Sequence, residues 1–147
     1  MTFLSASRYR NLLCKYNFRV VYFDICRSAV QDQCGVLDSA GWDCTAISTL
    51  SELLAIEDWK AYDLVLIDNK SNAYMMASRD KIDVAREVRS LGYELAVVSI
   101  TDIHGQRPSS TFFSDCIHKP LIEAESIRRL EKITCFYIYG RLISMHQ

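Results

Sequence analysis

The sequence predicts a single α/β domain with three layers, in which helices cover both faces of a doubly wound, five-stranded parallel sheet. Half of the 147 residues are hydrophobic, which is enough for one sizeable core. Short apolar runs alternate with segments of helical periodicity, a pattern typical of parallel βαβ units with right-handed crossovers. The clearest run, residues 62–68 (YDLVLID), has four consecutive aliphatic residues between two acids and therefore predicts the central strand.

The other elements follow from the same two periodicities. Nearly continuous apolar runs predict strands buried on both faces, and apolar residues at intervals of three and four predict helices with one buried face. The expected strands are residues 18–24, 42–48, 62–68, 95–101 and 114–118. The expected helices are residues 27–40, a short segment after Thr49, residues 80–91, and residues from about 122 to 139.

Local signals support several helix boundaries. Gly41 follows the first helix as a stop, and Thr49 with Glu52 three positions later forms a capping box for the second. Residues 102–113 contain glycine, proline and two adjacent serines and show little periodicity. We therefore expect a loop or a short helical turn there in place of a regular fourth helix.

Bulk properties exclude several classes of function. A net charge of −1 creates no field that would attract nucleic acid, and no apolar window approaches the length of a membrane span. The first residues lack the apolar run of a signal peptide. We expect residues 1–17 to form a leading helix or connector and residues 18–147 to form the domain, without nucleic acid partners or membrane insertion.

Six cysteines are scattered along the chain with no CxxC motif and with no histidine at ligand spacing, so a zinc site is disfavoured. Most of them lie in apolar runs, where free thiols behave as small hydrophobic side chains. We therefore expect reduced, structural cysteines and a cytoplasmic location. The six are Cys14, Cys26, Cys34, Cys44, Cys116 and Cys135.

Polar side chains follow the predicted strands at their carboxyl ends, where doubly wound sheets place their reactive groups. The first strand ends at Asp24, the third at Asp68 and the fourth at Thr101, and the fifth leads directly into Lys119. A carboxylate can attack a phosphoryl group, and a second carboxylate can help to hold Mg²⁺. The hydroxyl and the ammonium can bind the phosphoryl oxygens, so this set predicts phosphoryl transfer to an aspartate.

With these residues, the chain from about 19 to 139 resembles the receiver domains of two-component systems. DLVLID, ending at Asp68, resembles the phosphoacceptor strand of that family, Thr101 its conserved hydroxyl, and Lys119-Pro120 its lysine–proline step. The resemblance implies a flavodoxin-like sheet of strand order 2-1-3-4-5, with Asp68 as phosphoacceptor and Asp24 and Asp68 as Mg²⁺ ligands. It also implies a histidine kinase or a histidine phosphotransfer domain as the partner.

The sequence departs from the family in informative places. Ile25 stands where receivers carry a second acid, which is the more important metal ligand, and the family's methionine–proline pair is missing after Asp68. Lys70 brings a cation near the site, either replacing lost metal charge or facing solvent. Cys116 replaces the aromatic residue three positions before Lys119. Together with the shortened fourth-helix region, these departures resemble the degenerate receivers of hybrid sensor histidine kinases.

Two functions remain open from the sequence. The first is a phosphoaccepting receiver, a domain of a phosphorelay and not a stand-alone enzyme, in which Asp68 is modified. The second is a pseudo-receiver that docks to a kinase, a phosphotransfer domain or another receiver without chemistry. Another kind of small α/β enzyme is disfavoured, because three dispersed histidines assemble no nucleophile–base pair and no nucleotide-binding glycine loop is present.

Overall fold

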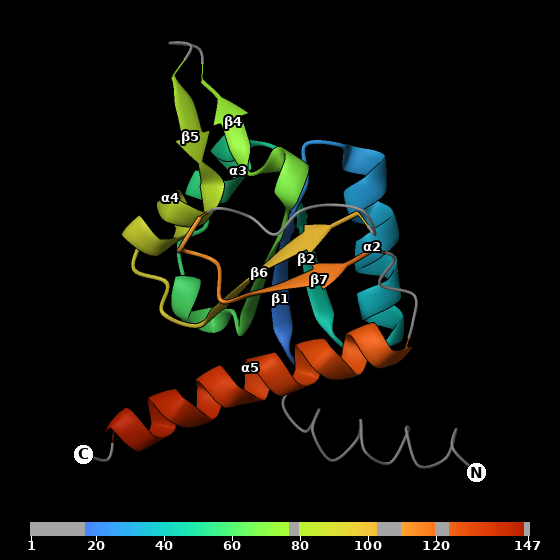
Figure 1. Cartoon of the computed structure of the whole chain (residues 1–147), viewed down its shortest axis with the longest axis vertical. Helices are drawn as coiled ribbons and strands as arrows, with labels where there is room; N and C mark the ends of the chain where they lie inside the picture. Colours follow the sequence, from blue (N-terminus) through green and yellow to red (C-terminus); the bar gives the residue numbers. More distant parts are fainter. Residues whose placement is uncertain (1–16, 77–79, 103–109, 120–123, 146–147) are drawn as a thin grey trace.

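The structure, a computed structural model, describes residues 17–76, 80–102, 110–119 and 124–145. In this part of the chain five parallel strands pair in the order β2-β1-β3-β6-β7, which confirms the expected order 2-1-3-4-5 (Figure 1). The strands of the sheet are β1 (Arg19–Phe23), β2 (Asp43–Ile47), β3 (Leu64–Asp68), β6 (Ala96–Thr101) and β7 (Asp115–His118).

Helices lie on both faces of this sheet. The helices are α2 (Arg27–Ser39), α3 (Leu50–Leu54), α4 (Val84–Ser90) and α5 (Ala124–Met145), with the 3₁₀ turns η1 (Trp59–Ala61) and η2 (Asn69–Ser71). α2 and the first half of α5 pack on one face of the sheet around Tyr22 and Leu66. α3 and α4 pack on the other face around Phe23 and Ile67. The three expected layers are therefore present.

Two predicted helix boundaries are confirmed in detail. Gly41 follows the end of α2 with φ +93°, a backbone conformation that glycine adopts without steric cost. The Thr49 hydroxyl accepts a hydrogen bond from the Glu52 amide at 3.1 Å, and it donates to the Glu52 carboxylate at 3.0 Å. The capping box thus starts α3 where the sequence placed it.

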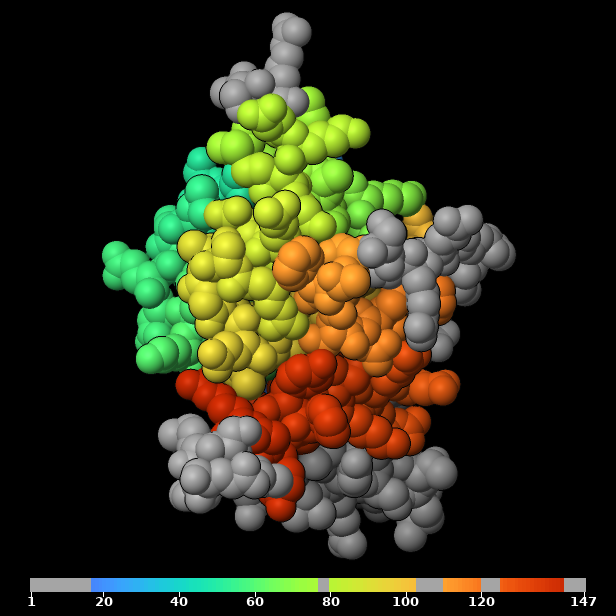
Figure 2. Space-filling model, turned by 60° about the vertical axis from the view of Figure 1, so that its left-hand side comes forward, coloured from blue at the N-terminus to red at the C-terminus, as the bar shows by residue number. Residues whose placement is uncertain are grey.

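The helix expected at residues 80–91 begins later, at Val84. Residues before it form β5 (Lys81–Asp83), which pairs antiparallel with β4 (Ala73–Met75) as a hairpin that projects from the body of the molecule (Figure 2). Asn72 explains the late start. Its carbonyl oxygen accepts from the Val84 amide at 2.8 Å, and its side-chain oxygen accepts from the Ala85 amide at 2.9 Å. These contacts satisfy amides of the first turn, so the helix can begin only after the hairpin returns to Asn72.

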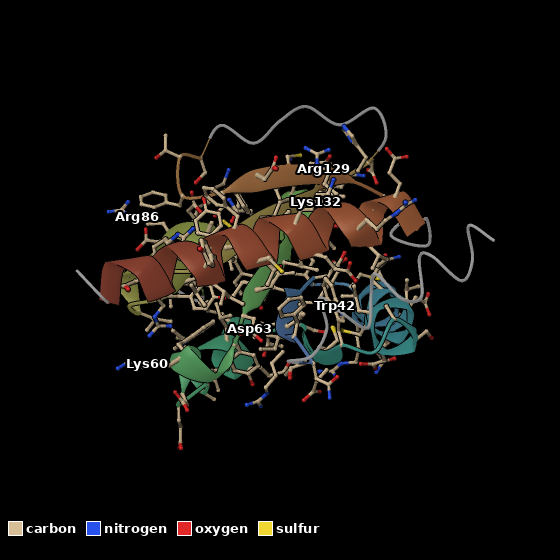
Figure 3. All side chains as sticks on the ribbon, turned by 90° about the horizontal axis from the view of Figure 1, so that it is seen from below. Trp42, Lys60, Asp63, Arg86, Arg129 and Lys132 are labelled. Atoms are coloured by element: carbon tan, nitrogen blue, oxygen red, sulfur yellow. A yellow bond between two sulfur atoms is a disulfide. The ribbon has the colours of Figure 1, made fainter. Side chains whose placement is uncertain are left out.

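α5 is longer than the predicted final helix and crosses beneath the amino-terminal ends of the strands (Figures 1 and 3). Ile127, Leu130 and Thr134 are buried, as expected from their spacing. Tyr137 and Ile138 contact the apolar clusters of both faces, which places this part of α5 under the sheet. Within the described ranges, no helix is long and apolar enough to cross a bilayer.

The cysteine prediction is wrong for one pair. Cys34 of α2 and Cys44 of β2 form a disulfide, with their Cα atoms 5.4 Å apart. The spacing of ten residues gives no sign of this bond, because α2 must first turn back and pack on β2 before the two side chains meet. Cys26, Cys116 and Cys135 are free thiols, as expected.

Some predictions fall on residues that the structure does not describe. These are the leading helix at residues 1–16, the centre of the loop at residues 103–109, and the segment 120–123 with the first residues of the predicted last helix.

Candidate functional site

Asp24 and Asp68 lie side by side at the carboxyl edge of the sheet. The last paired residues of β1 and β3 are Phe23 and Ile67, so the two acids occupy the next positions on adjacent parallel strands. Asp24 is 4% exposed and Asp68 is 3% exposed. Two carboxylates so deeply buried need hydrogen bonds or cations to offset the loss of water.

Both oxygens of Asp68 have partners. The Lys119 ammonium forms an ion pair with Oδ2, and the Lys70 backbone amide donates to Oδ1 at 2.8 Å. The Lys119 amide donates to the Thr101 carbonyl at 2.7 Å, so β6 holds the lysine backbone beside the site. The expected convergence of an acid from the third strand and a lysine after the fifth is therefore present, and the two side chains form an ion pair.

The Thr101 side chain reaches the same edge but faces other partners. Its hydroxyl lies 3.0 Å from His118 Nδ1 and 3.5 Å from Cys116 Sγ. The same His118 nitrogen lies 3.1 Å from the Asp102 carbonyl oxygen. Among the described residues, Thr101 and Asp68 share no hydrogen bond. The Thr101 hydroxyl is therefore engaged by His118 and not by Asp68.

Asp24 is held by groups that the sequence did not indicate. Its Oδ1 accepts from the Ser71 hydroxyl at 3.0 Å and from the Cys26 amide at 2.9 Å. Ser71, which is 2% exposed in the turn η2, also accepts from the Ile25 amide at 3.2 Å. Ser71 lies 47 positions after Asp24 in the sequence, so no local pattern indicates their hydrogen bond. The two side chains meet only because β1 and β3 are adjacent strands.

The site has the smallest number of carboxylates with which proteins bind Mg²⁺. The ion needs only one or two carboxylates when water and phosphoryl oxygens complete its shell. Asp24 and Asp68 would supply these carboxylates, and the second oxygen of Asp24 accepts no hydrogen bond from any residue in the described ranges. Ile25 is 55% exposed and adds no oxygen ligand. Described His, Cys, Asp and Glu side chains form no cluster of three or more that could hold a metal.

Lys70 faces solvent beside the site. Its ammonium lies 2.5 Å from Asp102 Oδ2, and the two side chains are 78% and 46% exposed. This hydrogen bond raises the pKa of Lys70 and lowers the pKa of Asp102. The sequence left open whether Lys70 replaces lost metal charge or faces solvent, and the structure shows a solvent-facing lysine paired with an exposed acid. The backbone amide of Lys70, and not its ammonium, contacts Asp68.

Tyr22 is a second residue that sequence reasoning missed. It lies on β1 two positions before Asp24, is fully buried, and its hydroxyl has no hydrogen-bond partner in the described part of the chain. Burial raises the pKa of Tyr22, and the negative charges of Asp68 and Asp24 raise it further. The phenol therefore lies within electrostatic reach of both acids.

Similar folds occur among solved response regulators. A receiver domain protein from Clostridium thermocellum matches with a TM-score of 0.62 at 19% identity, over 86% of this chain and 98% of its own. TrrA from Thermotoga maritima, in complex with Mg²⁺ and BeF, matches with a TM-score of 0.60 at 19% identity, over 79% of this chain and 98% of its own. NtrX from Brucella abortus matches with a TM-score of 0.67 at 18% identity, over 88% of this chain but only 29% of its own.

No protein-family model matches the chain, and no curated protein matches it by sequence. The structural likeness, at less than a quarter identity, establishes the fold. The chain is therefore receiver-like in architecture: it has the flavodoxin-like fold of response regulator receiver domains.

Proposed function

We propose that this domain is a receiver-type phosphoacceptor of a two-component system and that Asp68 accepts the phosphoryl group. The observation that carries the proposal is the ion pair between Lys119 and Asp68, with Asp24 beside it at the carboxyl edge of the sheet. A nucleophilic carboxylate, a second acid and a positioned ammonium are the parts that acyl phosphate formation needs.

The chemistry follows from these groups. A carboxylate oxygen of Asp68 attacks the phosphorus of a phosphohistidine, forming an O–P bond as the N–P bond breaks. The leaving imidazole nitrogen keeps the electron pair and then takes a proton. The Lys119 ammonium passes from the carboxylate to the transferred phosphoryl oxygens, whose charge it neutralises. Mg²⁺ held by Asp24 and Asp68 would supply further positive charge at those oxygens.

The phosphoryl donor in this proposal is a histidine kinase or a histidine phosphotransfer domain. The departures at Ile25, Lys70 and Cys116 support a domain that works within a hybrid sensor kinase, beside other domains of the same protein. A role inside a larger assembly also accords with Phe136 and Tyr139 of α5, which are 73% and 67% exposed.

A second candidate is a pseudo-receiver that docks to such partners without accepting phosphate. Two observations favour it. Ile25 occupies the place of the acid that would bind the metal most strongly, and the Thr101 hydroxyl is already engaged by His118. In this alternative the ion pair of Asp68 and Lys119 only stabilises the fold.

Beryllofluoride with Mg²⁺ separates the two candidates, because it mimics a phosphoryl group on a competent aspartate. Amide spectra of the whole chain should shift around Asp68 and Thr101 when both reagents are present. Asp68→Asn should abolish the shifts, while Asp58→Asn, an exposed acid near the opposite end of the sheet, should retain them. Unchanged spectra of the unaltered chain would exclude the phosphoacceptor and leave docking.

A further inference from the structure

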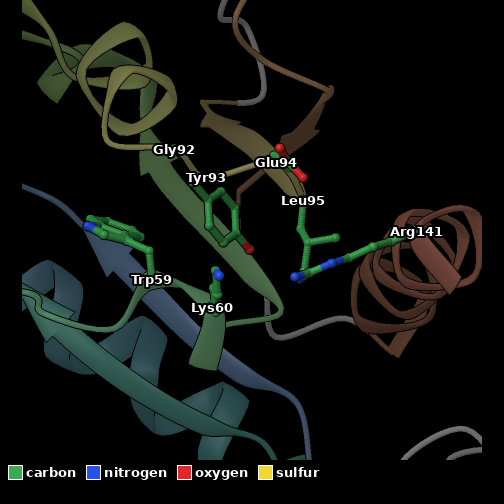
Figure 4. Close-up of a pocket in the computed structure, with 7 residues that line it drawn as sticks. All are labelled: Trp59, Lys60, Gly92, Tyr93, Glu94, Leu95 and Arg141. Carbon is green, nitrogen blue, oxygen red and sulfur yellow. The ribbon is translucent and has the colours of Figure 1, made fainter. Parts of the chain in front are cut away.

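A polar cavity lies at the end of the sheet opposite to Asp68. It has a volume of about 210 Å³, and its lining includes Trp59, Lys60, Tyr93, Glu94 and Arg141 (Figure 4). Trp59 and Lys60 belong to the turn before β3, and Tyr93 and Glu94 precede β6, so the cavity is at the amino-terminal ends of these strands. Arg141 reaches it from the last part of α5, which closes this side.

Tyr93 provides an unsatisfied hydroxyl in this cavity. The residue is 4% exposed, and its hydroxyl has no hydrogen-bond partner among the described residues. Burial is the main cause of its raised pKa, the charge of Asp63 raises it further, and Arg89 and Arg141 oppose the shift. A buried hydroxyl left without a partner costs about 1–3 kcal/mol unless water or a ligand bonds to it.

Two cations converge on the same point. Figure 4 shows the ammonium of Lys60, the guanidinium of Arg141 and the hydroxyl of Tyr93 directed toward one another across the cavity. Neither cation has a hydrogen bond or ion pair with another residue in the described ranges. Three donors from three separate segments therefore face one space, and none of them has an acceptor among the residues that the structure describes.

Charged side chains of both signs surround the cavity, and the acids among them are Asp63 and Glu94. Arg89 adds a third cation, but its guanidinium is already bonded to the carbonyl oxygens of Tyr93 and Leu95 and to Ser114. Asp63 accepts the Arg19 amide at 2.9 Å. In Figure 4 the Glu94 carboxylate points away from the three converging donors.

We propose that this cavity binds a compact phosphate group, either free or as a small phosphomonoester. A tetrahedral dianion accepts several hydrogen bonds at once, and a guanidinium, an ammonium and a hydroxyl match it. The volume is below the range of about 300–1,000 Å³ found for pockets that hold larger organic ligands, which restricts the occupant to a small molecule. The site is distant from Asp68 and does not depend on the function proposed for it.

Trp59 lines the cavity and makes binding observable. Tryptophan indole resonances of the whole chain should be followed while inorganic phosphate is added, with sodium chloride at equal ionic strength as the reference. The Trp59 signal should shift and saturate with phosphate but not with chloride, whereas Trp42, which packs on Phe18, should stay unchanged. A Trp59 signal that follows ionic strength alone would overturn the proposal.

Charge-removing variants test which groups bind. Arg141→Gln and Lys60→Gln should each weaken phosphate binding by about tenfold or more, the usual effect of losing a hydrogen bond to a charged group. Lys132→Gln removes an exposed cation from the same helix as Arg141 and should change the affinity less than about twofold. Equal losses in all three variants would show a general charge effect and contradict the site.

Tyr93→Phe separates a binding role from a structural one. Without phosphate the variant should melt at a higher temperature, because an unsatisfied buried hydroxyl is gone. With phosphate it should gain less in melting temperature than the unaltered chain. An unchanged phosphate response in Tyr93→Phe would contradict the assignment of this hydroxyl to the site.

Two further experiments identify the ligand and the place where it binds. Glycerol phosphate that competes with phosphate would assign a site for phosphomonoesters, and glycerol phosphate that fails to compete would assign a site for the free ion. Asp68→Asn should bind phosphate as the unaltered chain does. If Asp68→Asn abolished the Trp59 response, the anion would belong to the Asp68 end of the sheet and the proposal would be wrong.

Discussion

The Asp68 carboxylate lies in a place that water barely reaches, and its ion pair with Lys119 offsets the cost of burying it. The lysine side chain is 26% exposed and the aspartate side chain 4%, so the cost of burial falls mainly on the carboxylate. Such pairs add little net stability, but removing one partner leaves the other uncompensated. The same pair is therefore both a local stability element and the centre of the proposed chemistry.

Lys119→Met should lower the free energy of unfolding by about 2 kcal/mol, less than for a fully buried pair because the lysine is partly hydrated. Urea denaturation at neutral pH measures this loss. Lys132→Met, on the exposed face of α5, should change stability by less than about 0.5 kcal/mol. If Asp68→Asn is introduced together with Lys119→Met, much of the loss should be recovered, since no buried charge remains unpaired. A double variant as unstable as Lys119→Met alone would contradict this account.

Asp63 gives a pH dependence whose sign is fixed by burial. Loss of hydration raises the pKa of this carboxyl above its usual range, and the contacts with Arg19 only partly oppose the rise. The folded protein therefore holds the proton more tightly than the unfolded chain. The contribution of Asp63 to stability is greatest below the unfolded pKa of about 4 and is lost as the pH rises through the folded pKa.

Asp63→Asn should remove this component. From about pH 4 upward, through the range in which the folded Asp63 carboxyl ionises, the stability of the variant should fall less, or rise more, with pH than that of the unaltered chain. Urea denaturation across this window is the measurement, with Asp58→Asn as the control for an exposed acid. Parallel pH curves for Asp63→Asn and the unaltered chain would contradict the effect.

For individual residues, the sequence predicted which polar side chains stand at the ends of strands. It missed the contacts that join residues from different segments. Asp24, Asp68 and Lys119 could be placed at one edge because the end of a strand is visible in the pattern of apolar residues. Ser71 and Tyr22 carry no such pattern, since one lies in a turn and the other inside a buried strand. Their relation to the acids depends on which strands are neighbours.

The start of α3 depends on a cap in its own local sequence. The helix has only five residues, so the Thr49–Glu52 capping box satisfies a large share of its free amides. Thr49→Ala should lower the free energy of unfolding by about 1 kcal/mol, the usual value for a lost N-cap. Ser51→Ala, at an exposed position within the same helix, should cost nothing or stabilise slightly. Thermal unfolding of both variants checks the contrast.

The hairpin of β4 and β5 shows where element prediction fails. Residues 80–91 have helical spacing at Val84, Val88 and Leu91, and this spacing continues a helix pattern toward Asp80. The hydrogen bonds of Asn72 decide otherwise, because the chain must first pair with residues 73–75. Periodicity identifies the buried face of a helix, but its first residue depends on which group caps the free amides.

In the molecule as a whole, α5 contacts both of the apolar clusters that lie on opposite faces of the sheet. Its buried side chains start on the face shared with α2 and end in contact with both apolar clusters. The sequence predicted the sheet order and the layers because buried strands, helix faces and connection handedness are repetitive features. It did not predict the course of α5 below the strands, which follows from the packing of Tyr137 and Ile138 with residues far away in the chain.

Leu130→Ala tests how much the fold relies on this helix. Leu130 is fully buried in the cluster between α5 and the sheet, so the variant should lose about 3 kcal/mol of unfolding free energy through lost burial and the cavity left behind. Phe136→Ala, with 73% of the side chain exposed, should change stability by less than about 0.5 kcal/mol. Similar losses for the two variants would show that α5 is docked differently.

The bond between Cys34 and Cys44 has a consequence for encounters between copies of the chain. Among the residues that the structure describes, β2 is an outermost strand and pairs with β1 alone, so its other side offers backbone groups to a neighbouring chain. The disulfide ties this strand to α2 of the same chain, so β2 cannot separate from α2 while the bond is intact. Reduction of the bond would remove that restraint, so a reducing environment should favour strand exchange and an oxidising one should suppress it.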